Sequence, residues 1–287
     1  MFFKTFSTTM KRIFRSPAML FSIPAILIML QQRTQVITKN SSPDFLFIQG
    51  GYFYQIYSAT PRDYIYNQML FNAVLIPITH CLPIVIAVVL ALVLRDFYNS
   101  SERDILFATN IPFGKYYFSK LLCAFTISLG VLCLFTAAYM IFIIPQFEME
   151  IPFINMLWRA IVMTLGMGVV GILNYMAVCI FFTAITRQVI VGSAAIVVYS
   201  LMESTMATVM HFSNSVFWAY TYFPQGKLWK FFYLWGTPWF EDFLETTGVT
   251  TGQMWTCVGV TGLMIIVALL TGYLTFGSLR VKARRAA

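Results

Sequence analysis

Long apolar stretches recur along the chain between shorter polar segments, and this alternation is its dominant pattern. A helix that crosses a hydrocarbon layer of about 30 Å needs roughly 20 mostly apolar residues. The first stretch is the weakest, because Pro24 interrupts it and its strongly apolar part ends near Leu30. The pattern predicts an all-α polytopic membrane protein with six transmembrane helices. They lie at about residues 17–35, 64–94, 117–144, 155–185, 188–210 and 254–279.

A different, amphipathic pattern marks residues 1–16. Apolar residues recur at helical spacing on one side, and basic residues fill the other. A helix of this kind lies in the plane of the membrane interface, with its basic edge toward anionic lipid. We therefore expect an interfacial helix at the cytoplasmic surface, with a frayed basic tail as the alternative. The apolar side holds Phe3, Phe6, Met10, Ile13 and Phe14, and the other side holds Lys4, Lys11, Arg12 and Arg15.

The composition supports this class of protein. Hydrophobic residues make up 59% of the 287-residue chain and charged residues 10%, which is more apolar surface than one soluble core could bury. Disorder is excluded as well, because disordered segments are poor in aromatic residues and these make up 17% of the chain. The five cysteines lie in apolar runs without CxxC spacing, so we interpret them as packing residues and expect no metal site.

The 19 lysines and arginines are unevenly distributed, which predicts an orientation. Basic residues near transmembrane helices stay preferentially on the cytoplasmic side. Six helices with both termini in the cytoplasm put most of the basic residues on that side, whereas five helices would leave one basic terminus outside. We expect a multi-pass protein of the cell membrane. The net charge of +8 then reflects topology, and we expect no nucleic-acid partner.

The predicted cytoplasmic connection at residues 95–116 is too long to be a simple turn. Charged residues that favour a helix start are followed there by apolar residues and then by a proline. A short helix at about residues 100–112 would suit docking of a soluble partner, with a plain intracellular loop as the alternative. The residues of this candidate coupling helix are Glu102, Arg103, Asp104, Ile105, Leu106, Phe107 and Pro112.

The predicted outer segment at residues 211–253 is rich in aromatic residues, which are favoured in the headgroup layer. Prolines and glycines divide it into pieces too short to cross the membrane. Non-helical backbone at that depth must be shielded by protein. We therefore expect short re-entrant or interfacial helices between the fifth and sixth transmembrane helices.

In this order, these parts resemble the ABC-2 type permease family, the membrane subunits of ATP-driven exporters. In sequence the resemblance depends on Arg15, Pro17 and Pro24 around the first transmembrane helix, and on Glu102, Leu106, Pro112 and Lys120 around the coupling helix. The family's Gly-Thr pair after the glutamate and its second adjacent leucine are absent. The resemblance implies an amphipathic helix at 1–16 and a six-helix transmembrane domain at 17–287.

The resemblance also implies partners. Two such subunits, identical or different, form a dimer in the lipid membrane, and each coupling helix inserts into a cleft of a cytoplasmic ATPase. This chain has no GxxxxGK[ST] phosphate-binding loop, because the sequence around Gly114-Lys115 lacks the upstream glycine and the following Ser or Thr. We therefore expect no enzymatic activity and no cofactor in this chain. ATP and Mg²⁺ would be bound by the separate ATPase subunit.

A few polar residues within predicted transmembrane helices are candidates for a substrate pathway, because buried charge is costly there. Ser200, Ser204 and Thr208 recur every four residues on the fifth helix, and Glu203 borders them. The alternative is that Glu203 makes an interhelical hydrogen bond. His80, in the second helix, could face a cavity or be a packing residue.

Three classes of function fit a polytopic membrane protein. An exporter subunit for an amphipathic substrate such as a lipid, peptide or drug agrees best with the resemblance. An ion-coupled secondary transporter is the alternative, but it normally requires carboxylates near the membrane midplane and often two related halves. An intramembrane enzyme would need clustered catalytic groups, and the two histidines lie on different predicted segments. An ATPase in a neighbouring reading frame would favour the first class.

Overall fold

The computed structural model describes residues 2–19, 82–99, 111–142, 151–209 and 251–286, and these residues form helices without any strand. The all-α prediction is thus confirmed for the described part of the chain. In chain order the helices are α1 (Phe2–Phe14), α5 (Leu82–Tyr98), α7 (Phe113–Phe142), α8 (Ile151–Thr186), α9 (Val189–Val209) and α13 (Thr251–Ala286).

Among the described residues, three helices are long and apolar enough to cross a membrane: α7 over Phe113–Leu134, α8 over Gly168–Thr186 and α13 over Val258–Ser278. A shorter apolar stretch, Val189–Met202, lies in α9. The last four predicted transmembrane helices therefore correspond to α7, α8, α9 and α13. The predicted first helix, residues 64–81 of the second, and most of the outer segment at 211–253 lie outside the described residues.

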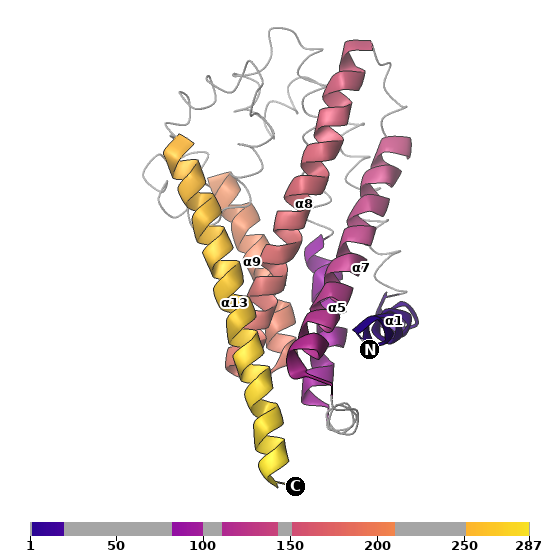
Figure 1. The fold of residues 1–287 in the computed structure, drawn as a ribbon. Helices are drawn as coiled ribbons and strands as arrows, with labels where there is room; N and C mark the ends of the chain where they lie inside the picture. Colours follow the sequence, from indigo (N-terminus) through magenta and orange to yellow (C-terminus); the bar gives the residue numbers. More distant parts are fainter. Residues whose placement is uncertain (1, 20–81, 100–110, 143–150, 210–250, 287) are drawn as a thin grey trace.

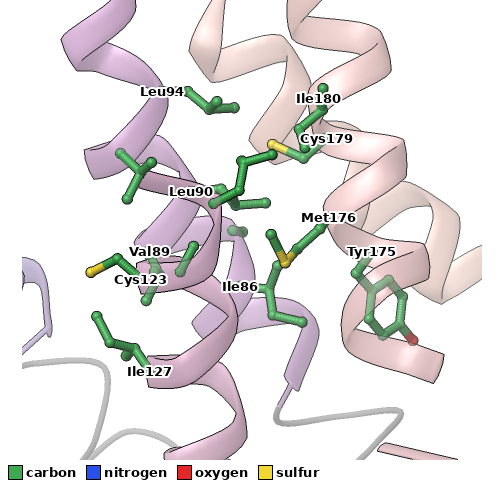
Figure 2. Packing of buried hydrophobic residues seen from close by; sticks show 14 of the residues in the cluster. Ile86, Val89, Leu90, Leu94, Cys123, Ile127, Tyr175, Met176, Cys179 and Ile180 are labelled. Carbon is green, nitrogen blue, oxygen red and sulfur yellow. The ribbon is translucent and has the colours of Figure 1, made fainter. Parts of the chain in front are cut away.

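Helix α5 lies at the centre of the bundle. Most of its residues are buried, including Val85, Ile86, Val89 and Leu90, each 0% exposed, and only a narrow strip from Ile84 to Arg95 is partly buried or exposed. A helix with so wide a buried apolar surface needs several neighbours, and α5 contacts α7, α8 and α9. Figure 2 shows the packing, with α5 side chains between Cys123 of α7 and Met176 of α8.

Helices α8 and α9 form an antiparallel hairpin with a tight turn at Arg187. This residue adopts a left-handed conformation with φ of 58°, and its N–H donates to the Thr183 carbonyl at 2.9 Å, which ends α8. The two helices approach closely at Gly192, where a Cβ atom would lie 1.9 Å from Thr183 Oγ1 and 2.6 Å from the Cys179 carbonyl oxygen. Only glycine fits this crossing without displacing backbone.

Helix α13 packs against α8 along one side and exposes apolar residues on the other. At the contact, a Cβ atom on Gly272 would lie 2.4 Å from Ile180 Cγ2. On the outer side Leu263, Ile266 and Leu274 are 62%, 56% and 68% exposed. Apolar surface of this extent on a long helix suits contact with lipid or with another apolar helix rather than with water.

Helix α1 lies across the bundle instead of along it, and Figure 1 shows it nearly end-on beside α7. The structure confirms the amphipathic helix but divides its predicted apolar side into two. Ile13 is buried and Phe6 and Met10 pack against the core, whereas Phe3 and Phe14 are 82% and 50% exposed. The division arises because one helix face contacts protein and the adjacent face does not.

Candidate functional site

The end of the bundle where α5 finishes and α7 begins contains a buried cluster of charges. Asp96 of α5 accepts from two cations through the same oxygen, Oδ2: Lys120 Nζ of α7 at 2.6 Å, and Arg12 Nη2 of α1. The side chains of Asp96 and Lys120 are 5% and 4% exposed, and that of Arg12 is 44% exposed. We call these three residues the Asp96 cluster. It connects three segments that are distant in sequence.

The burial of these charges determines how much each contact contributes to the stability of the fold. A buried ion pair offsets the desolvation cost of both groups, and removal of one partner leaves the other charge uncompensated at a cost of about 3–5 kcal/mol. Lys120 gains a further contact, because its Nζ lies 5.1 Å from the centre of the Tyr116 ring. The half-exposed Arg12 contributes less, about 0–1 kcal/mol. The buried Asp96–Lys120 pair thus contributes most of the stability of the cluster, and Arg12 is its solvent-accessible member.

A cluster of aromatic rings surrounds Phe97, the residue next to Asp96. Its ring stacks on Phe276 of α13 with centroids 4.9 Å apart and meets Tyr116 and Tyr117 of α7 edge-on or tilted at 5.5 and 5.7 Å. Tyr117 also donates a hydrogen bond to the Leu269 carbonyl of α13 at 3.0 Å. Aromatic pairs at these separations contribute about 0.5–1.5 kcal/mol each beyond area burial. They join α5, α7 and α13 at this end.

Tyr98, the last residue of α5, adds a connection to α8. Its hydroxyl donates to the Thr183 carbonyl at 3.1 Å. Burial raises the pKa of Tyr98 to about 12, and the nearby Arg187 charge opposes that rise. The hydroxyl is therefore protonated at physiological pH and available as a donor. With this bond, the end of α5 is tied to α1, α7, α8 and α13.

These contacts hold the ends of α1, α5, α7, α8 and α13 in position relative to one another. Within the described ranges, no group of three or more His, Cys, Asp or Glu side chains could hold a metal ion. Cys123 and Cys179 are buried free thiols, in agreement with their interpretation as packing residues, whereas Cys133 is exposed. The cluster fixes the two helix ends between which the polar connection runs, from Asn99 to Pro112.

The predicted boundaries of that connection were wrong at both ends. The sequence placed residues 95–116 in a loop, but α5 continues to Tyr98 and α7 begins at Phe113. The Pro112 carbonyl accepts the Tyr116 N–H at 3.2 Å, so this proline starts α7, and Gly114 lies inside that helix. The other predicted coupling residues, Glu102 through Phe107, lie outside the described residues.

The predicted pathway residues can be placed only in part. Ser200, Glu203, Ser204 and Thr208 all lie on α9, as expected, and Ser200 is partly buried. The side chains of the other three, and all of His80, lie outside the described residues. A nearby polar contact holds α9 to α8, because Asn174 Nδ2 donates to the Tyr199 hydroxyl at 3.0 Å.

The sequence analysis did not identify the Asp96 cluster. One signal was present: the apolar positions Leu90, Val93 and Phe97 continue the helical spacing past Arg95 and predict a helix through Asp96. No signal in the sequence identified Lys120 or Arg12 as its partners.

Comparison of the chain with protein-family models, with curated proteins and with solved structures found no match in any of the three. The function is therefore inferred from the residues and their arrangement.

Proposed function

We propose that this chain is the membrane-spanning subunit of an ABC-2 type exporter that moves an amphipathic substrate such as a lipid, peptide or drug. A separate subunit would bind and hydrolyse ATP with Mg²⁺, and a second permease subunit would complete the dimer. The observation that carries the proposal is the Asp96 cluster. It fixes the helices on both sides of the predicted coupling helix to each other and to the amphipathic helix α1.

A segment that transmits force from a soluble motor must have rigid ends. The end of α5 is held by a buried ion pair, by aromatic contacts around Phe97, and by the Tyr98–Thr183 hydrogen bond. The start of α7 is held by the same ion pair and by Tyr117. A displacement of the intervening segment would therefore reach α7, α8 and α13 together instead of bending one loop.

The distribution of charge supports a cytoplasmic location for this end. Exposed basic residues gather here from α1, α5, α7 and the α8–α9 turn, and Arg95, Lys115 and Arg187 are among them. Basic residues favour the cytoplasmic side of a membrane. A soluble ATPase could reach the connection between α5 and α7 only in this orientation.

The location of Asp96 argues against an ion-coupled secondary transporter. Such transporters use carboxylates near the midplane at a site open to ions. Asp96 lies at the end of α5 and is paired with two cations.

The proposal is tested with the tagged full-length chain expressed together with the reading frames that neighbour it in its genome. Leu106→Asp or Phe107→Asp should reduce recovery of an ATPase subunit by about thirtyfold, since loss of an apolar anchor costs roughly 2 kcal/mol or more. Ser100→Asp adds the same charge at a polar position of the same connection and should leave recovery unchanged. Membrane insertion is monitored in parallel by a C-terminal tag.

Two outcomes would contradict the proposal. The first is that no Walker-motif ATPase co-purifies with the unaltered chain under conditions that preserve membrane complexes. The second is that recovery of the ATPase and transport are unchanged in both the Leu106 and the Phe107 variants, in which case the connection is only a linker.

A further inference from the structure

The outward face of α1 carries two parallel rows of side chains. One row is Phe3 and Phe14, eleven residues apart, and the other is Lys4, Lys11 and Arg15, which are seven and then four residues apart. At 3.6 residues per turn, this spacing keeps each row on one line along the helix, and the two rows lie side by side.

The structure separates these residues from the part of α1 that packs against the protein. Ile13 and Thr9, on the opposite face, are 1% and 2% exposed. Arg12 reaches Asp96 at a third edge of the helix. Lys4, Lys11 and Arg15 are exposed, as are Phe3 and Phe14. Of the four basic residues of α1 and its C-terminal flank, one is thus engaged inside the protein and three point outward.

We propose that this outward face of α1 binds anionic phospholipid, with the phosphate against Lys4, Lys11 and Arg15 and the acyl chains against the phenylalanine row. The positive charge of α1 is complementary to an anionic lipid, because residues 2–19 contain no aspartate or glutamate. The helix lies across the bundle, so both rows can follow the plane of a membrane surface along their whole length (Figure 1). An acidic protein surface would match the basic row but would leave the adjacent phenylalanine row exposed to water.

The proposal is independent of the transport function, because it concerns only the membrane placement of α1. Each basic side chain at a membrane surface strengthens attraction to anionic lipid by roughly fivefold. Three together therefore favour an anionic over a zwitterionic lipid by up to about a hundredfold. The phenylalanine row adds apolar burial, which is the same for both lipids.

The test titrates the delipidated full-length chain in detergent with dioleoylphosphatidylglycerol or dioleoylphosphatidylcholine and counts bound lipids by native mass spectrometry. The unaltered chain should prefer phosphatidylglycerol by about tenfold or more, and high salt should reduce this preference. The triple variant Lys4→Gln, Lys11→Gln, Arg15→Gln should bind both lipids within about threefold of each other.

A charge-matched control removes three exposed basic residues from the same end of the bundle but not from α1: Arg95→Gln, Lys115→Gln and Arg187→Gln. It should keep the preference. Phe3→Ser with Phe14→Ser should weaken binding of both lipids by a similar factor and keep the selectivity. All variants are first checked for an unchanged gel-filtration profile.

The proposal would be overturned if the α1 triple variant kept the preference for phosphatidylglycerol. It would also be overturned if the control variant lost that preference to the same extent, because the selectivity would then come from the overall charge of this end of the bundle and not from α1. If the α1 triple variant kept the lipid preference but no longer purified with a protein that accompanies the unaltered chain, this face would be assigned to a protein partner instead. The assay contains no ATPase and no substrate, so its outcome does not depend on whether the chain is an exporter subunit.

Discussion

The Asp96 cluster makes a quantitative prediction for Asp96→Asn. The substitution keeps the size of the side chain but removes its charge, so Lys120 remains buried, at 4% exposed, without a counter-ion. The cost for a broken buried pair is about 3–5 kcal/mol. We expect the lower end of that range, because the amide oxygen still accepts a hydrogen bond from Lys120. For a chain of 287 residues, about 3 kcal/mol lowers the unfolding midpoint by roughly 5 °C.

The cysteines of the chain provide the assay. Cys123 and Cys179 are buried and react with a thiol-reactive dye only when the bundle opens. A Cys81→Ser, Cys133→Ser, Cys257→Ser background removes the other three of the five cysteines. Fluorescence against temperature for the detergent-solubilised chain then reports the opening of the core around α5, α7 and α8.

A double-mutant cycle isolates the pair from other effects. Lys120→Met in the Asp96→Asn background removes the second buried charge and should restore most of the lost stability, because a neutral, well-packed pair costs little. Arg12→Gln alone should cost about 1 kcal/mol or less, since Arg12 is 44% exposed. The reasoning is refuted if Asp96→Asn leaves the midpoint within about 2 °C of the unaltered chain, or if the double variant is less stable than Asp96→Asn alone.

Two further predictions concern topology and packing. A single cysteine at Ser100 should be labelled only from the cytoplasm and one at Thr247 only from outside in intact cells; labelling of Ser100→Cys by an impermeant reagent from outside would contradict the six-helix order. Gly192→Ala should destabilise the α8–α9 hairpin by about 2 kcal/mol or more, because the new Cβ would meet the Cys179 carbonyl. Gly259→Ala, which meets nothing within 4 Å, should be neutral or slightly stabilising in the same thermal assay.

The long apolar helices that the structure describes were predictable because their signal is local. The prediction for α8 was residues 155–185 and the helix spans Ile151–Thr186, and for α9 it was 188–210 against Val189–Val209. A lipid environment requires a long run of apolar residues, and that requirement is met by each segment separately. The remaining errors are at the helix ends; α13, for example, continues to Ala286 through charged residues beyond its predicted end at 279.

The Asp96 cluster was not predictable for the opposite reason. Hydropathy falls at Arg95 and Asp96, and the sequence analysis therefore ended the second transmembrane helix at residue 94. The charge of Asp96 is buried because α1 and α7 happen to supply Arg12 and Lys120 at that point. Such a partnership depends on tertiary packing, which a single sequence does not contain.

Helix α1 was predictable only in part. Its helical pattern was clear, but the sequence treated all its phenylalanines as one face. The structure buries part of that face against α7 and leaves Phe3 and Phe14 outside. Helical spacing shows which residues share a side, but not how wide a strip the neighbouring protein covers.

The order in which the cluster is synthesised follows from the separation of its members. Arg12 precedes Asp96 by 84 residues, and Lys120 follows Asp96 by 24. When Asp96 emerges from the ribosome, Arg12 has already emerged, whereas Lys120 is still inside the ribosome. We therefore expect Arg12 of α1 to be the first counter-ion available to Asp96 during synthesis, before α7 supplies Lys120.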